Sequence, residues 1–180
     1  LPTKVGSPVS VASLTRNIEK SHDTVKLWLN WLKELYFIFE IKPWHKKITR
    51  SIKKESKIYL WDYNEIKNPG GKVENMVAMH LLNSCNFWTD SGKGDFELFY
   101  LRNKDKQEID FLIVRDGEPW LPVEVKTGST SPSPNWRRFL QDIGCKRALQ
   151  ITDKPIRKLY SEEDTDLLIT NAADALIHFV

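Results

Sequence analysis

Cysteine is scarce in this chain, with only Cys85 and Cys145 among 180 residues. Neither belongs to a C-x-x-C pair, so the sequence offers no disulfide framework and no cysteine-based zinc site. The four histidines also show no spacing typical of metal ligands. We therefore expect free thiols, a reducing cytoplasm as the compartment, and no structural zinc.

Long apolar runs and phosphate-binding loops are missing as well. No apolar run approaches the ~20 residues that span a membrane, and the start of the chain lacks the apolar core of a signal peptide. The sequence therefore predicts no membrane association. Lys72 follows two glycines but precedes Val73, which excludes the G-x-x-x-x-G-K-[ST] loop. The missing initial methionine is compatible with a fragment of a longer protein.

The charge is unevenly distributed along a chain of otherwise ordinary globular composition, 41% hydrophobic and 28% charged. Residues 1–66 carry a net charge of +5 and residues 67–180 a net charge of −2. The run Asn68-Pro-Gly-Gly71 between them is typical of a turn. We predict two domains, 1–66 and 67–180, of which the basic one suits contact with nucleic acid.

Two helices are predicted in the first domain. Ser10 is a suitable N-cap for a helix over 10–20, and Ser21 or Asp23 for a helix over 23–37. The apolar residues of both segments follow helical spacing. In the second helix these positions are Val25, Trp28, Leu29, Leu32, Leu35 and Tyr36. Two helices joined by so short a turn are typical of a helix-turn-helix.

Strand-like composition over 37–44 and 57–63, with a basic stretch between them, adds a wing to this motif. Winged helices place a helix in the major groove while basic loops hold phosphates. Docking onto a protein is the alternative, because Trp28 and Trp31 suit packing better than base readout. The candidate phosphate contacts in this domain are Lys26, Lys46, Lys47, Arg50, Lys53 and Lys54.

The second domain is predicted to have the order α-β-β-β-α-β. Helical spacing or strand composition marks, in turn, residues 72–85, 96–102, 108–116, 120–126, 133–144 and 147–152. We expect the first helix to pack with Val73, Met76, Val77, His80 and Leu81 along one side. A strand over 165–170 and a short helix over 172–180 are expected in the tail.

Three charged residues on the predicted strands suggest chemistry. Glu124 and Lys126 share a face because side chains alternate along a strand, while Val123 and Val125 point into a core. Asp110 lies on the preceding strand. Carboxylates held on strands can bind Mg²⁺, and a lysine beside them can orient water, which suits metal-assisted phosphodiester hydrolysis. The alternative is an ordinary solvated strand face.

This order of elements, with Asp110 followed by Glu124-Val125-Lys126, resembles the PD-(D/E)xK nuclease superfamily, which includes restriction endonucleases and Holliday-junction resolvases. The residue before Asp110 is isoleucine rather than the proline of the superfamily's name. The resemblance implies an α+β fold: an N-terminal winged helix-turn-helix, then a restriction-endonuclease-like αβββαβ domain with a central mixed sheet. The implied catalytic residues are Asp110, Glu124, Lys126 and Glu74.

The resemblance implies that Asp110, Glu124 and the Val125 carbonyl bind one Mg²⁺ or Mn²⁺, and that Glu74 completes the site directly or through a water. Crowded carboxylates repel one another, so we expect one raised carboxyl pKa when no cation is present. Glu108 is interpreted as a solvated charge, with a further ligand as the alternative. The candidate phosphate contacts in this domain are Arg102, Arg137 and Arg138.

A resemblance over nearly the whole chain is to the C-terminal region of prokaryotic AAA+-type ATPases named DUF4143. The matching stretches are residues 25–29 with Leu32, 57–62, 71–75, 99–102, 108–111 and 123–126. This resemblance implies an ATPase domain as a partner in a longer protein, and nucleases of this fold often form homodimers. The predicted function is a metal-dependent DNA nuclease. The alternative is a catalytically inactive module that binds DNA or docks on an ATPase, with its polar residues kept as a salt-bridge cluster.

Overall fold

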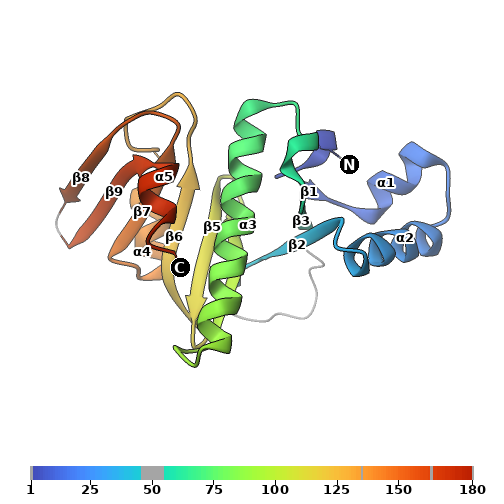
Figure 1. The fold of residues 1–180 in the computed structure, drawn as a ribbon, viewed down its shortest axis with the longest axis horizontal. Coiled ribbons are helices and arrows are strands. Elements are labelled where there is room, and N and C mark those ends of the chain that lie inside the picture. The colour runs from blue at the N-terminus through green and yellow to red at the C-terminus, as the bar shows by residue number, and fades with distance from the viewer. Residues whose placement is uncertain (1, 46–54, 135, 163, 180) are drawn as a thin grey trace.

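A single mixed β-sheet of nine strands organises the computed structural model, which describes residues 2–45, 55–134, 136–162 and 164–179 (Figure 1). The strand order is β1-β3-β2-β4-β5-β6-β7-β9-β8. The strands are β1 (Pro8–Val9), β2 (Ile38–Pro43), β3 (Ser56–Leu60), β4 (Phe96–Arg102), β5 (Glu108–Arg115), β6 (Glu118–Val125), β7 (Arg147–Thr152), β8 (Arg157–Glu162) and β9 (Thr165–Asn171).

Helices cover both faces of this sheet. They are α1 (Val11–Ile18), α2 (His22–Glu34), α3 (Pro69–Asp90), α4 (Trp136–Ile143) and α5 (Ala172–Leu176), with short 3-10 turns at Pro2–Lys4 and Tyr63–Glu65. α3 and α5 pack on one face over a shared apolar cluster, and α4 packs on the other face over a second cluster. In the described part of the chain, no helix is long and apolar enough to cross a membrane.

The first two helices begin where their caps predict. The Ser10 side chain accepts a hydrogen bond from Ser13 N, and the Ser21 side chain accepts one from Thr24 N. These bonds satisfy backbone donors that a helix leaves free at its first turn. The choice between Ser21 and Asp23 as the second cap is thereby decided for Ser21.

The apolar face predicted for α2 is only partly buried. Val25 and Leu29 are in the core, but Trp28 is 39% exposed and Trp31 51% exposed. The two tryptophans are thus not part of the core, and the choice between docking on a protein and base readout stays open. The cluster beneath α2 is small, since it is shared mainly with Ile38, Ile58, Leu60 and Ile66, and it covers only the narrow stripe of the helix that faces β2 and β3.

The strands predicted to flank the wing extend the central sheet. β2 pairs antiparallel with β3 and parallel with β4, through Lys42↔Phe99 and Pro43↔Tyr100. The sheet thus runs without a break across the predicted boundary at residue 66, although the division into two domains and the winged helix both stay predictions. Lys26 is exposed on α2. The other five candidate phosphate contacts of this region, Lys46, Lys47, Arg50, Lys53 and Lys54, lie outside the described residues.

The run Asn68-Pro-Gly-Gly71 begins a helix rather than forming a separate turn. Asn68 is the N-cap of α3, its Oδ1 accepts from Gly71 N at 2.8 Å, and Pro69 fills the first helical position. α3 is consequently longer than predicted and continues to Asp90. His80, expected on the packed side, is exposed because the buried stripe runs instead through Val77, Ala78, Leu81, Cys85 and Trp88.

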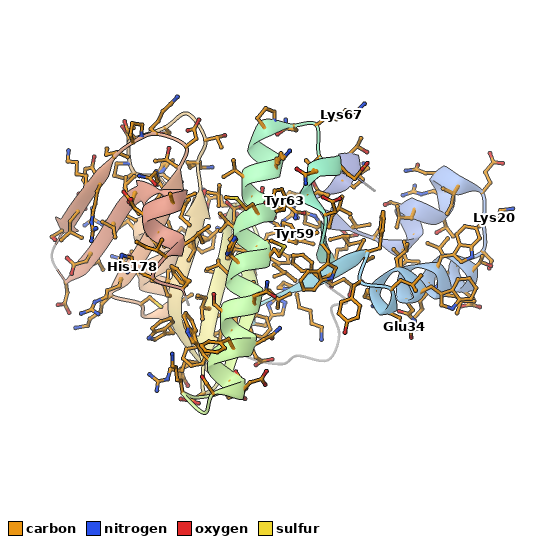
Figure 2. The ribbon with its side chains drawn as sticks, in the orientation of Figure 1. Lys20, Glu34, Tyr59, Tyr63, Lys67 and His178 are labelled. Carbon is orange, nitrogen blue, oxygen red and sulfur yellow. The ribbon has the colours of Figure 1, made fainter. Side chains whose placement is uncertain are left out.

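Asn75 joins α3 to the strands of the N-terminal region. Its side chain is fully buried, its Oδ1 accepts from Leu60 N at 2.8 Å, and its Nδ2 donates to Leu60 O at 2.7 Å. Both backbone groups of Leu60 would otherwise be buried without a partner on that side. This clamp holds β3 against α3 (Figure 2 shows Tyr59 of β3 beside the helix).

We expect Asn75→Ala to lower the free energy of unfolding by about 2 kcal/mol, because it leaves a buried donor and a buried acceptor unsatisfied. Urea denaturation measures the loss. Asn83→Ala makes the same change on the exposed side of the same helix and is expected to cost less than about 0.5 kcal/mol. Equal losses in the two variants would show that helix propensity, and not the clamp, sets the cost.

From α3 onward the elements follow the predicted order α3-β4-β5-β6-α4-β7, and the strand and short helix expected in the tail are β9 and α5. β8 was not predicted. It is an edge strand paired only with β9, and most of its residues are exposed, so it carries neither an apolar run nor a clear alternation.

Candidate functional site

A bulge in β5 sets the position of Asp110. The β4–β5 register passes from Leu101↔Ile109 to Phe99↔Leu112, so that Asp110 and Phe111 together stand opposite Tyr100. A bulge of this kind bends a strand and re-aims a side chain. Pairing between β5 and β6 runs only as far as Phe111↔Val123, which leaves Asp110 just beyond the end of that ladder.

Beyond the end of the β5–β6 ladder, the Asp110 carboxylate accepts a backbone hydrogen bond from the residue that ends β6. Its Oδ2 accepts from Val125 N at 2.9 Å, while Lys126 N donates to Ile151 O of β7 at 2.8 Å. β6 therefore stays joined to β7 as it parts from β5. The N–H and C=O of one residue in an extended strand point to the same side, so the Val125 carbonyl faces the gap between β5 and β6 together with Asp110.

Glu124 is buried beside this gap, with a relative exposure of 2%. Its Oε1 lies 3.0 Å from Nζ of Lys126, whose side chain is 45% exposed. Its Oε2 is buried and has no hydrogen-bond partner among the described residues. Val123 lies on the other side of the strand in the core under α3, which is the alternation that the sequence predicts.

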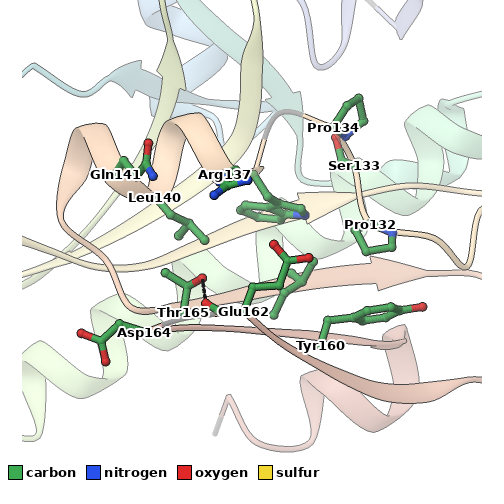
Figure 3. Close-up of a pocket in the computed structure, with 12 residues that line it drawn as sticks. Pro132, Ser133, Pro134, Arg137, Leu140, Gln141, Tyr160, Glu162, Asp164 and Thr165 are labelled. Carbon is green, nitrogen blue, oxygen red and sulfur yellow. Dashed lines mark hydrogen bonds between the residues drawn. The ribbon is translucent and has the colours of Figure 1, made fainter.

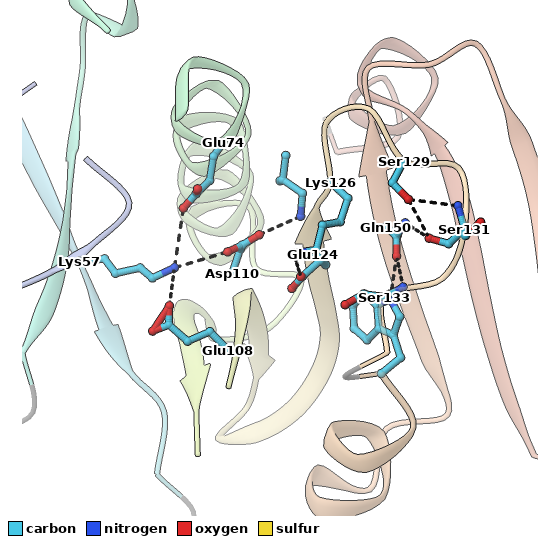
Figure 4. Close-up of polar contacts among 12 residues, drawn as sticks. Lys57, Glu74, Glu108, Asp110, Glu124, Lys126, Ser129, Ser131, Ser133 and Gln150 are labelled. Atoms are coloured by element: carbon cyan, nitrogen blue, oxygen red, sulfur yellow. Dashed lines mark hydrogen bonds and ion pairs between the residues drawn. The ribbon is translucent and has the colours of Figure 1, made fainter. Parts of the chain in front are cut away.

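Lys57 of β3 lies at the centre of the acidic residues (Figure 4). Its Nζ is 3.5 Å from Asp110 Oδ1, 3.6 Å from Glu108 Oε1 and 3.7 Å from Glu74 Oε1, and its side chain is only 2% exposed. The sequence pattern placed Lys57 only at the start of the strand-like segment 57–63 and did not predict this role. The available signal was a lysine next to the apolar run Ile58-Tyr59-Leu60, on the same face as Tyr59.

Glu74 is held on the Lys57 side of this cluster. The Tyr59 hydroxyl donates to Glu74 Oε1 at 2.9 Å. The backbone of Gly6 also passes close by, since a Cβ there would lie 2.6 Å from the same oxygen, and its φ of +71° suits glycine. Glu74 is thus next to Asp110, as the family resemblance implies, but its contacts are to residues of the N-terminal region.

Glu108 is not a solvated charge, which was the first interpretation of its position in the sequence. It pairs with Lys57, and its Oε2 lies 3.2 Å from Nη1 of Arg102. Arg102, a candidate phosphate contact, is therefore already paired. Glu108 and Asp110 are two residues apart on β5, and both side chains contact Lys57. Glu108 is therefore part of the same cluster.

The two other candidate phosphate contacts lie on α4. Arg138 pairs with Asp105 at 3.0 Å. Arg137 lines a hollow of about 340 Å³ that is bounded by Trp136, Tyr160 and Glu162 (Figure 3). Arg138, like Arg102, is therefore already paired with an acidic side chain.

Two carboxyl groups of the cluster have raised pKa values. Burial, reinforced by the charge of Asp110 and opposed by Lys126, raises the pKa of Glu124 to about 7. Burial and Asp110 raise the pKa of Glu74 to about 7 as well, against Lys57 and the Tyr59 hydrogen bond. Burial lowers the pKa of Lys57, but its three carboxylate neighbours outweigh this and raise it, so the ammonium stays charged. Crowding of the carboxylates predicted one raised carboxyl pKa, and there are two.

The gap between β5 and β6 has the chemistry of a site for Mg²⁺ or Mn²⁺. The unpartnered Glu124 Oε2, the Asp110 carboxylate and the Val125 carbonyl are oxygen donors of the kind that such ions prefer. Within the described residues no group of three or more Asp, Glu, His or Cys side chains is arranged to hold a metal. Asp110, Glu124 and the Val125 carbonyl provide oxygen donors that fit such an ion, and the role of Glu74 as a further ligand stays a prediction.

The family model described as "Domain of unknown function (DUF4143)" matches residues 69–170, more than half of the chain. The chain belongs to the DUF4143 family. A second model, "Domain of unknown function (DUF8612)", matches residues 1–63. No curated protein and no solved structure matches the chain. Asp110, Glu124, Lys126 and Glu74 all lie within the DUF4143 match, whereas Lys57 lies within the DUF8612 match.

Proposed function

We propose that the DUF4143 region of this protein hydrolyses phosphodiester bonds of DNA with the help of a divalent cation. One observation carries the proposal: the buried, unpartnered oxygen of Glu124 lies beside Asp110, the Val125 carbonyl and Lys126 where β5 parts from β6. The order α3-β4-β5-β6-α4-β7 supports a PD-(D/E)xK nuclease fold.

Each residue of this site has a distinct role in the proposal. Asp110, Glu124 and the Val125 carbonyl hold Mg²⁺ or Mn²⁺, which when bound polarises the scissile phosphate and lowers the pKa of a water. The half-exposed Lys126 ammonium leaves Glu124 to contact the incoming phosphate, where it neutralises charge that builds up during attack. Glu74 adds negative charge from the Lys57 side.

Charge and resemblance support the wider proposal. The net charge of +5 over residues 1–66 favours DNA as the substrate class. The resemblance to the AAA+-associated region supports an ATPase domain as a partner, and the nuclease resemblance supports a homodimer. Buried thiols at Cys85 and Cys145 are in keeping with a reducing cytoplasm.

A non-catalytic module is the second candidate, and specific contacts favour it. Lys126 pairs with Glu124, and Lys57 pairs with Glu74, Glu108 and Asp110, so most of the acidic charge is already balanced by lysines. Such a cluster would let the protein dock on DNA or on an ATPase without binding a metal.

Cleavage assays on linear, supercoiled, single-stranded and branched DNA with Mg²⁺ or Mn²⁺ test the proposal. We expect Asp110→Ala and Lys126→Ala to slow cleavage by at least about 100-fold, because each removes a charge that acts on the transition state. Lys93→Ala is the matched control, since this exposed lysine lies in the turn after α3, at the end of that helix opposite to Glu74.

Absence of cleavage on every substrate, together with absence of Mn²⁺ binding, would reject the enzyme. DNA binding that weakens with salt but survives Asp110→Ala would then identify the non-catalytic module. Cleavage that survives both substitutions would place the active site elsewhere in the chain.

A further inference from the structure

We propose that Lys57 occupies the position of a second cation in this site, so that the site binds a single divalent ion and is completed by the N-terminal region. The inference rests on the proposed function, and it assigns a positioning role to a residue outside the nuclease-like motif. Its support comes from the contacts of Lys57, the charge balance of the cluster and the origin of β3.

The contacts of Lys57 are those of a bound cation. Its ammonium group has three donors and lies within 3.5–3.7 Å of oxygens from three carboxylates, on α3 and on β5. Long lysine side chains usually extend their charge into water, yet this one is 2% exposed. The buried ammonium therefore offsets the repulsion among the three carboxylates, as a bound metal ion would.

Asp110 connects the two cation positions. Its Oδ1 faces Lys57 at 3.5 Å, and its Oδ2 faces the gap between β5 and β6, where it meets Val125 N. In two-metal hydrolases two cations lie about 3.5–4 Å apart and act together on one phosphate. Here the ammonium takes one of these two places, and the gap beside Glu124 remains for the other (Figure 4).

The charge of the cluster favours one divalent ion over two. With every group ionised, the carboxylates of Glu74, Glu108, Asp110 and Glu124 and the cationic groups of Lys57, Lys126 and Arg102 give a net charge of −1. One divalent ion turns this into +1, which matches the single negative charge of a phosphodiester. A second would leave +3 in a largely buried site, where uncompensated charge is costly.

Lys57 belongs to β3, which is part of the N-terminal region, so this region contributes a residue to the site. β3 lies within the DUF8612 match and is attached to the DUF4143 region by Tyr59–Glu74 and Asn75–Leu60 hydrogen bonds. In this proposal the N-terminal region is part of the site, because Lys57 of β3 supplies the positive charge that holds Asp110 and Glu74 in place.

Titration of the full chain with Mn²⁺, with free Mn²⁺ followed by electron paramagnetic resonance, tests the inference. We expect one tightly bound Mn²⁺ for the parent protein and for Lys57→Arg, which keeps the charge. Lys57→Met frees three carboxylates and is expected to bind a second Mn²⁺. Lys93→Met removes an exposed lysine and should remain at one.

The variant Lys57→Gln provides a second test if Lys57→Met folds poorly, because its polar side chain can donate a hydrogen bond to the carboxylates while the positive charge is removed. It should still bind a second Mn²⁺ through Glu74 and Asp110. A parent protein that binds two ions, or a Lys57→Met or Lys57→Gln variant that folds and stays at one, would overturn the inference and leave the proposed function standing. A parent protein that binds no Mn²⁺ would instead overturn the proposed function itself.

Discussion

Lys57→Met is expected to destabilise the protein by about 3–5 kcal/mol at pH 8 in the absence of divalent metal, the range for breaking a buried ion pair from one side. The substitution leaves Glu74, Glu108 and Asp110 around an apolar side chain. Among the described residues, the positive charges that remain near them are Arg102, which pairs with Glu108, and the half-exposed Lys126. Urea denaturation followed by circular dichroism measures the change.

Lys33→Met is the matched control for this experiment. Lys33 also forms an ion pair, with Glu40 at 3.4 Å, but its side chain is 37% exposed, and a surface pair contributes about 0–1 kcal/mol. At pH 5 the deficit of Lys57→Met should shrink, since Glu74, with its pKa of about 7, becomes neutral. A loss as small as that of Lys33→Met would show that the three carboxylates are solvated rather than dependent on Lys57.

Glu124→Gln is expected to stabilise the protein by about 3 kcal/mol at pH 8 without metal. Burial raises the pKa of Glu124 to about 7 from a value of about 4.3 in an unfolded chain. A raised carboxyl pKa means that the neutral form is favoured in the fold. The stability it contributes is present below about pH 4.3 and is lost as the pH rises towards and through 7. Glutamine stays neutral and keeps an oxygen for Lys126.

The difference in unfolding free energy between the parent and Glu124→Gln should therefore be large at pH 8 and small at pH 4.5. Glu97→Gln, the same substitution at an exposed position of β4, should show no such dependence. Mn²⁺ should stabilise the parent more than Glu124→Gln, because a ligand that binds only the folded state adds stability. A Glu124→Gln variant that is destabilised at pH 8 would mean that the ionised carboxylate is well compensated in the fold.

Local signals in the sequence were enough for much of the fold. Ser10 and Ser21 cap their helices, and β4 through β7 and α4 lie within a few residues of their predicted bounds. Caps and strand alternation depend on hydrogen bonds and side-chain directions over a few residues, so a short window of sequence contains the information. Strand alternation also predicted that Glu124 of β6 and Lys126, just after it, share a face, and their side chains are 3.0 Å apart.

The exposure of individual side chains and the presence of an edge strand depend on packing partners that are distant in the sequence, so no local pattern predicts them. Trp28 has helical apolar spacing, but the small cluster under α2 leaves it partly in solvent. β8 forms because β9 offers it a backbone to pair with, and its own residues are mostly exposed. The turn-like run at Asn68 became a helix start because its side chain caps Gly71 N.

By itself the sequence determined that this chain has caps, strands and a pair of carboxylates beside a lysine, in an order that resembles a nuclease core. Only the tertiary structure decided that β5 bulges at Asp110, that the sheet continues into the N-terminal region, and that Lys57 lies among the acids. Lys57 and Asp110 are 53 residues apart. Their contact depends on how β3, α3 and β5 pack together, and packing over such separations leaves no mark in local periodicity.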